Sequence, residues 1–320
     1  PTQPLSPFTG LPAAPDAPVL VVKLDNTTFA QPHVGLTRAD LVIVEPVEYG
    51  LTRLAAVFSS DIPDRIGPVR SARITDIDLA SLLGHPVLAF SGAQHLMYPV
   101  LKAAPIDLVT PATRGEGFAR DHHRHAPYNE FVDGTVALTR AIDDHGSPGS
   151  PARDIGFTFD DQVPAGGVPA THARVTWPES SATFDYDASD STYAIRLNGR
   201  PAGDGADPRG PHAASVVITF VDTPNSVFHD KFGGITPRAQ VIGTGRAVIL
   251  RDSRAYEATW TRPSADAPMT LTGPDGTAIP LHPGQQWWLL ADVRREARIR
   301  ATITADTTPG SYASQSASSS

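Results

Sequence analysis

Residues 66–83 (IGPVRSARITDIDLASLL) bring together the side chains in this chain that are most suited to chemistry. Arg70 and Arg73 are followed closely by Asp76 and Asp78. Guanidinium groups beside the start of a helix favour a bound anion or a buried carboxylate, because charges that leave water need partners. The segment therefore predicts either a ligand-facing site or an Arg–Asp network inside the protein, and the sequence leaves both open.

A helix must position these groups. Pro68 biases the residue before it away from helical geometry, and Ser71 is suited to cap a helix over residues 72–83. The apolar residues of this helix lie nearly all round its circumference, which predicts that it is buried on most sides.

Polar residues also stand at the ends of strand-like runs. Asp25 and Asn26 end one apolar run, Glu45 and Glu48 close a second, and Arg53 begins a third. Ligands of open α/β sheets bind at the carboxyl ends of strands. Asp25, Glu45 and Glu48 are therefore candidate acids or bases. Asn26 and Arg53 are candidate ligand contacts. The two glutamates are three positions apart and should point to opposite faces of a strand, so at most one is expected in the site. The alternative is a structural pair between a glutamate and an arginine.

The segment RDHHRHAPYN (120–129) carries three histidines beside an aspartate, which allows a metal site. The spacing matches no metalloenzyme signature, however, so a solvated loop whose arginines face the first cluster is the favoured interpretation. Its last residue is suited to cap a helix over 129–145. The histidines are His122, His123 and His125, and the expected ligand-binding residues are Arg120, Arg124 and Asn129.

His95 is a further candidate general base, because imidazole titrates near neutral pH. The alternative is an ordinary polar residue at the start of a helix over 93–104, which Pro99 should kink or end. No GxSxG motif surrounds Ser71 or Ser91, and no Walker or Rossmann glycine pattern occurs. A serine hydrolase is therefore poorly supported, and no cofactor or metal is predicted.

The composition limits the class of protein. The chain has 320 residues, no cysteine and a formal charge of −8, which argues against nucleic-acid binding and excludes disulfides and thiol chemistry. No apolar run reaches the length of a membrane span. The chain begins at Pro1 without methionine, so a leader sequence can have been removed. The abundance of Pro, Gly and Ala with few Lys suggests an actinobacterial source.

The order of apolar runs predicts an α+β protein with two domains. Residues 1–17 are expected to be an extended tether, 18–148 an α/β domain with a polar cleft, and 155–305 a β-rich, sandwich or barrel-like domain. Runs 40–50 and 51–60 are expected to form a hairpin. Residues 306–320 are Ser-rich and are expected to be disordered.

Three tryptophans stand out in the second half. Trp287 and Trp288 are adjacent, so in a strand they must face opposite sides. One of them, or Trp260, is either exposed and able to stack on a sugar ring or partner, or buried in the core.

Several motifs together resemble the YerB-like family of bacterial lipoproteins. They are GLTRADLVIVEPVEYGLTRLAAVFSS, DRIGPVRSARITDIDLA and RDHHRHAPYNEF in the first half, and YAIRLNGRPAGD, GTGRAVILRDSRAYEATWTRPS and DGTAIPLHPGQQWWLL in the second. The resemblance implies two domains and an exported, extracytoplasmic protein held at the membrane by a lipid. The lipid-bearing cysteine would precede Pro1. The resemblance implies no biochemical activity, and it does not extend to the histidines of the 120–129 segment.

Three functions remain in competition. The leading hypothesis is a cell-envelope protein that binds a polar or anionic ligand, such as a cell-wall fragment, in an Arg/carboxylate cleft. The rival is an extracytoplasmic hydrolase or transferase that uses Asp25, Glu45 or Glu48 as acid or base and the arginines to stabilise negative charge. The third is a scaffold that recruits partners. None of them requires nucleic acid, and the membrane is contacted only through the lipid anchor.

Overall fold

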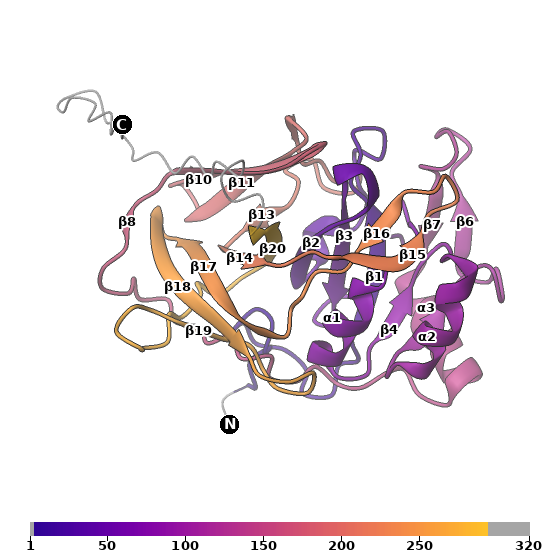
Figure 1. The fold of residues 1–320 in the computed structure, drawn as a ribbon, viewed down its shortest axis with the longest axis horizontal. Helices are drawn as coiled ribbons and strands as arrows, with labels where there is room; N and C mark the ends of the chain where they lie inside the picture. The colour runs from indigo at the N-terminus through magenta and orange to yellow at the C-terminus, as the bar shows by residue number, and fades with distance from the viewer. Residues whose placement is uncertain (1–2, 294–320) are drawn as a thin grey trace.

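The computed structural model describes residues 3–293, which form a β-rich protein with its α-helices in the first half of the chain (Figure 1). The first half contains strands β1 Leu20–Asp25, β2 Leu41–Pro46, β3 Thr52–Phe58, β4 Val87–Ala89, β5 Asp107–Val109, β6 Phe118–Arg120 and β7 Glu130–Val132. Its helices are α1 Thr75–Leu83, α2 Tyr98–Ala103 and α3 Gly134–His145, with 3-10 turns η1 Leu36–Arg38, η2 Glu48–Gly50 and η3 His95–Met97.

The second half consists of strands. They are β8 Val168–Pro169, β9 His172–Trp177, β10 Ser180–Asp187, β11 Thr192–Leu197, β12 Arg200–Pro201, β13 His212–Ala213, β14 Ser215–Val221, β15 Asn225–His229, β16 Ile235–Pro237, β17 Gly243–Arg251, β18 Arg254–Arg262, β19 Thr270–Thr272 and β20 Gln286–Asp292. This agrees with the predicted concentration of helices before residue 146.

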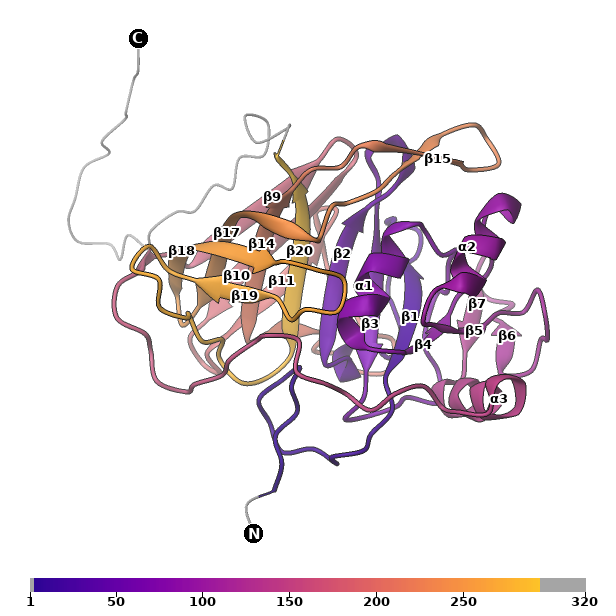
Figure 2. The ribbon, with the colours of Figure 1, turned by 60° about the horizontal axis from the view of Figure 1, so that its bottom comes forward.

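One large sheet runs through both halves of the chain. Its strands lie in the order β19-β18-β17-β14-β20-β2-β3-β1-β4-β5, with β8 beside β18. Strand β20 lies between β14 and β2 and runs parallel to both of them. The last described strand therefore joins the two halves by backbone hydrogen bonds, and Figure 2 shows it at the centre of the sheet. The predicted division into an α/β domain and a sandwich or barrel-like domain stays a prediction.

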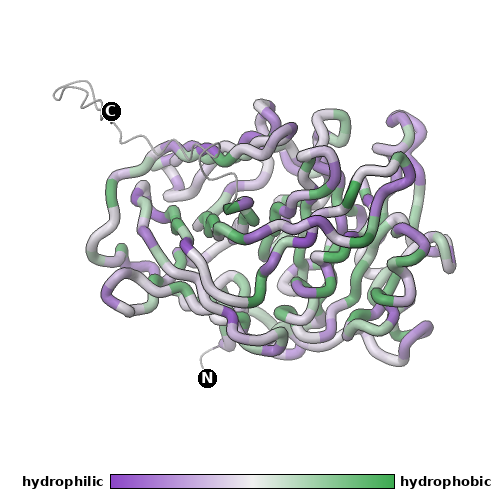
Figure 3. The backbone as a smooth tube through the Cα atoms, in the orientation of Figure 1, coloured by the Kyte–Doolittle hydropathy of each residue, from purple (hydrophilic) through white to green (hydrophobic). Residues whose placement is uncertain are grey.

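Apolar side chains fill both faces of this sheet, and hydrophobic residues concentrate along its strands while many peripheral loops are hydrophilic (Figure 3). Trp287 and Trp288 point to opposite faces, as the strand pattern predicts, and both are buried. Trp287 packs against Phe184 of a smaller sheet, β12-β11-β10-β9, with ring centroids 6.0 Å apart. Trp260 is buried as well, so of the two alternatives the structure shows burial for all three tryptophans.

The β2–β3 hairpin forms as predicted, whereas the helix starts differ. Helix α1 begins at Thr75, and Ser71 does not cap it. The backbone before it is used elsewhere, because the N–H of Arg70 donates to the Lys23 carbonyl (2.8 Å) and that of Ala72 to the Gly92 carbonyl (2.9 Å). These bonds tie residues 70–72 to the neighbouring segments in a non-helical path, and the helix begins after them.

The other two helices also start later than predicted. Helix α2 begins at Tyr98 with Pro99 in its first turn, where a missing N–H costs little. Helix α3 begins at Gly134, and the Asp133 carboxylate caps it by accepting from two backbone N–H groups. Asn129 is therefore not a cap, since strand β7 separates it from the helix.

The N-terminal segment is packed rather than extended as a tether. Phe8 is fully buried, and an isolated bridge joins Leu5 to Pro12. The predicted disordered tail at 306–320 and the end of the predicted β-rich domain at 294–305 lie outside the described residues.

Candidate functional site

The candidate site lies where apolar side chains are replaced by charged ones along one face of the sheet. Side chains two apart in a strand share a face, so the apolar residues facing α1 give way to charged ones toward the ends of β1 and β2 and the start of β3. The strand register places Asp25 and Glu45 on either side of Arg53. The apolar members of this face are Val21, Ile43 and Ala55.

Beneath the surface lies a closed cluster of charges. The Lys23 ammonium contacts the Glu45 carboxylate and lies 2.7 Å from the Asp76 carboxylate, and all three side chains are almost completely buried. Burial, and then the charge of Asp76, raise the pKa of Glu45 to about 7, although Lys23 opposes the shift. We call these three residues the lysine cluster. Lys23 was not among the predicted site residues, and its signal in the sequence is a lone lysine inside the apolar run 18–26.

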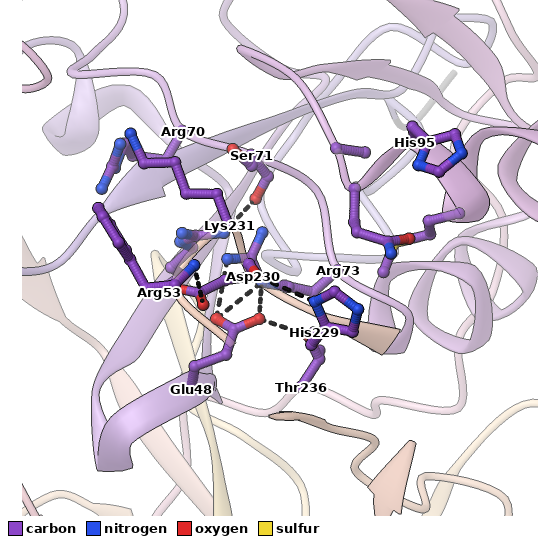
Figure 4. A pocket seen from close by; sticks show the side chains of 14 residues that line it. Glu48, Arg53, Arg70, Ser71, Arg73, His95, His229, Asp230, Lys231 and Thr236 are labelled. Atoms are coloured by element: carbon purple, nitrogen blue, oxygen red, sulfur yellow. Dashed lines mark hydrogen bonds and ion pairs between the residues drawn. The ribbon is translucent and has the colours of Figure 1, made fainter. Parts of the chain in front are cut away.

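Three arginines, Arg53, Arg70 and Arg73, line one pocket near these strand ends (Figure 4). Arg70 donates from Nε to the buried Asp25 carboxylate at 2.6 Å. Arg73 donates from Nε and Nη2 to Glu48, at 2.9 and 2.8 Å. The Arg73–Glu48 contact is the predicted type of pair between a glutamate and an arginine, and Glu48 is the glutamate of the two that reaches these arginines. Its pKa is lowered because, although burial raises it, the charge and hydrogen bonds of Arg73 outweigh burial.

Arg53 differs from its two neighbours because it has no carboxylate partner. It is 8% exposed, and its Nη1 donates to the Ser71 carbonyl at 2.6 Å. Within residues 3–293, no carboxylate lies within ion-pair distance of it. Burial, and then the charges of Arg73 and Arg70, lower the pKa of Arg53 to about 9. The fold thus holds a buried positive charge that an anion would stabilise.

These arginines line a cavity of about 500 Å³, which we call the arginine pocket. Its other wall is the β15–β16 hairpin, which reaches from the second half of the chain across β1 and β3 (Figure 1). The hairpin is fixed by a hydrogen bond from Thr236 to Glu48 and by one from the Tyr49 hydroxyl to Asp230 (3.0 Å). It contributes His229, Asp230, Lys231, Phe232 and Thr236 to the lining.

This hairpin was not among the predicted parts of the site. The run DKFGG (230–234) indicates a turn, but no pattern in one sequence places that turn on the first half of the chain. The remaining lining residues come from the first half and include Ser71 and His95, both predicted. His95 lies to one side, away from Glu48 (Figure 4).

Other predicted site residues lie outside the arginine pocket. Asn26 donates to the Thr52 hydroxyl (2.8 Å) behind the pocket wall, and Asp76 belongs to the lysine cluster. Arg120, Arg124 and Asn129 do not line the arginine pocket. These cations have partners of their own nearby, since Arg120 donates to the Asn129 side chain (3.0 Å) and Arg124 to backbone carbonyls.

The histidine segment is a surface loop. His122, His123 and His125 are exposed, and in the part of the chain that the structure describes no group of three or more metal-ligating side chains gathers.

The arrangement is suited to holding an anion. Four cationic side chains line the arginine pocket, namely those of Arg53, Arg70, Arg73 and Lys231, against two carboxylates, those of Glu48 and Asp230. Both carboxylates already accept hydrogen bonds from protein groups.

A β-rich fold built around one mixed sheet, with an arginine-lined pocket at the ends of its strands, is the class that these observations define. Family models for the N-terminal and C-terminal domains of "protein of unknown function (DUF3048)" match residues 8–147 and 173–288. The chain therefore belongs to the DUF3048, or YerB-like, family.

Known proteins agree with this assignment. The "Putative lipoprotein YerB" of Bacillus subtilis (strain 168) is 48% identical over 56 residues, which span 18% of this chain and 17% of that relative's length. The crystal structure of YerB from Bacillus subtilis has the same fold, with a TM-score of 0.77 at 20% identity over 91% of this chain and 98% of that chain. Among the described residues, no helix is long and apolar enough to cross a membrane.

Proposed function

We propose that this protein binds an anionic ligand, through a phosphate, carboxylate or sulfate group, in the arginine pocket. The observation that carries the proposal is Arg53, a buried guanidinium that lines the pocket without a carboxylate partner in the described chain. Guanidinium groups bind planar or tetrahedral anions through paired N–H donors, so an anion at this position satisfies a charge that the fold leaves unpaired.

The balance of charge in the pocket supports the same ligand class. Asp25 lies behind Arg70 and neutralises it, yet the four lining cations still exceed Glu48, Asp230 and Asp25 together. The surplus positive charge attracts anions although the whole chain carries a formal charge of −8.

A carboxylate-based hydrolase or transferase has less support from the geometry. Asp25 and Glu48 are each held by an arginine, and Glu45 is enclosed in the lysine cluster. A general base needs a free carboxylate within reach of a substrate proton, and none of these three offers one in the pocket.

The proposed setting is the outer face of the cytoplasmic membrane, where cell-wall material is the natural anionic ligand. The name of the YerB relative supports this location. Fractionation of cells that produce the full-length precursor should recover it with membranes, and mutation of its anchor cysteine should release it. Recovery from the cytosol would contradict the location.

The test of the binding function is Arg53→Met beside the matched control Arg53→Lys. Titration calorimetry with inorganic phosphate and with sulfate should show binding to the wild type that falls about 10- to 100-fold in Arg53→Met, because a hydrogen bond to a charged group is lost. Arg53→Lys should retain part of the affinity. Arg53→Met should keep the free energy of unfolding within about 1 kcal/mol, since no buried carboxylate is left behind.

Two results would contradict the proposal. One is a wild type that binds neither anion. The other is a large loss of stability in Arg53→Met with no change in anion affinity, which would make Arg53 a structural residue.

A further inference from the structure

Two aromatic rings form an exposed platform outside the arginine pocket. Phe29 and Tyr128 stack with ring centroids 5.6 Å apart and an interplanar angle of 26°. Phe29 is 74% exposed. Phe29 rests against the Tyr128 ring and is exposed to solvent, so it presents a flat apolar face at the surface.

The platform adjoins the arginine pocket through Arg70. The guanidinium carbon of Arg70 lies 5.9 Å from the centroid of the Tyr128 ring, and the same side chain lines the pocket and binds Asp25. A ligand whose charged group reaches Arg70 can therefore extend past Tyr128 to the face of Phe29 that the stacked pair leaves free.

Polar side chains frame the platform, and the two loops that carry it are fastened to each other. The cavity beside the rings has a volume of about 570 Å³, and its lining includes Gln31, His123 and His125. Arg124 donates to the carbonyl of Ala30 at 3.0 Å and to the carbonyl of Pro32 at 2.6 Å. These bonds tie the Tyr128 loop to the Phe29 loop, so the platform exists before any ligand arrives.

We propose that Phe29 and Tyr128 form a second subsite that stacks a sugar ring, and that the acidic substituent of this sugar occupies the arginine pocket. The inference rests on the proposed anion-binding function and narrows its ligand to an acidic saccharide. The C–H face of a sugar packs on an aromatic ring, and imidazole groups such as those of the exposed His123 and His125 can hydrogen-bond its hydroxyls.

The shared chemistry of the ligand is a sugar ring that carries an acid. The acid can be a carboxylate or a phosphate, and two probes, one with each acidic group, distinguish these two ligand types. One is the disaccharide of N-acetylglucosamine and N-acetylmuramic acid, which carries a lactyl carboxylate. The other is N-acetylglucosamine 6-phosphate. Chitobiose is the matched neutral control, since it has the same two rings as the first probe and no acid.

The experiment is titration calorimetry of the full chain and of Phe29→Ala. The wild type should bind at least one acidic sugar about tenfold more tightly than chitobiose and than inorganic phosphate. Phe29→Ala should lose about 3- to 10-fold of that affinity, the range expected for one stacking contact, and should bind phosphate as the wild type does. Val168→Ala, which truncates another exposed apolar side chain (59% exposed), should bind the sugar normally.

Each other outcome rejects a defined part of the proposal. Phosphate binding with equal sugar affinity in wild type and Phe29→Ala would overturn the subsite and leave the anion function standing. A wild type that binds neither phosphate nor an acidic sugar would overturn both. Phe29-dependent binding of adenosine monophosphate in preference to both sugars would overturn the saccharide class.

Discussion

The lysine cluster and the arginine pocket are neighbouring parts of one charged layer, built from the same strands and the same kinds of side chain. In the lysine cluster, one cation meets two carboxylates away from water. In the pocket, cations are in excess, and Arg53 is left without a carboxylate. The contrast teaches that pairing, more than residue type or burial, separates the charges that hold the fold from those to which the proposed function assigns a ligand.

The largest expected effect tests the lysine cluster. Lys23→Met leaves Glu45 and Asp76 buried without a counter-charge, and the free energy of unfolding should fall by about 3–5 kcal/mol. Chemical denaturation measures this. Combining Lys23→Met with Glu45→Gln removes one of the stranded charges and should recover part of the loss. A loss below about 1 kcal/mol in Lys23→Met would contradict this prediction, because it would mean that the buried ion pairs of the lysine cluster contribute little to the stability of the fold.

Arg73 should behave as a structural residue although it lines the pocket. Arg73→Met strands the buried Glu48 and should cost about 3 kcal/mol, at the low end for a buried pair because the pocket side is open. Hydrogen exchange should also quicken across residues 225–237, since Glu48 holds the hairpin through Thr236. Unchanged stability beside a loss of anion binding would move Arg73 into the same class as Arg53.

The raised pKa of Glu45 makes stability depend on pH. The folded protein binds this proton more tightly than the unfolded chain, so the contribution is complete below about pH 4.5 and disappears as pH rises through about 7. The change should be about 3 kcal/mol. Denaturation curves of wild type and Glu45→Gln measured from pH 4 to pH 8 isolate it, because the variant lacks the titrating group. Parallel pH profiles for the two proteins would contradict the shift.

His95 should give the smallest effect. It lies exposed at the rim of the pocket, to one side of Glu48, so His95→Ala should leave the free energy of unfolding unchanged within error. Phosphate affinity should change less than in Arg53→Met. A loss equal to that of Arg53→Met would place the anion nearer to the rim than to the buried guanidinium.

Local patterns identified much of the first half of the site. The β2–β3 hairpin and the polar strand ends follow from runs of apolar residues, and the pairing of Arg70 and Arg73 with carboxylates follows from the cost of burying charge. The helix starts could not be predicted, because the backbone of Arg70 bonds to β1. Helix propensity is a local property of the sequence and does not show that another segment binds these backbone groups.

Long-range contacts account for the remaining differences. The role of Lys23 depends on Asp76, which is 53 positions later, and the pocket wall depends on a hairpin near residue 230. Arg120 and Arg124 carry the charge that an anion site needs, yet their neighbours on the loop and on the Ala30 segment satisfy them. A single sequence shows which residues need partners and does not show which partners they find.

Strand β20 also governs the order in which this molecule can be completed. It is the last described strand, yet it inserts at the middle of the sheet and supplies the parallel pairing between β14 and β2. A chain that emerges from a ribosome or a translocation channel with its N-terminus first must keep two open strand edges until residue 292 is free. Open edges invite pairing with other chains, and such non-local closure is slow. The waiting time before β20 arrives is therefore the period in which this protein most needs protection from aggregation.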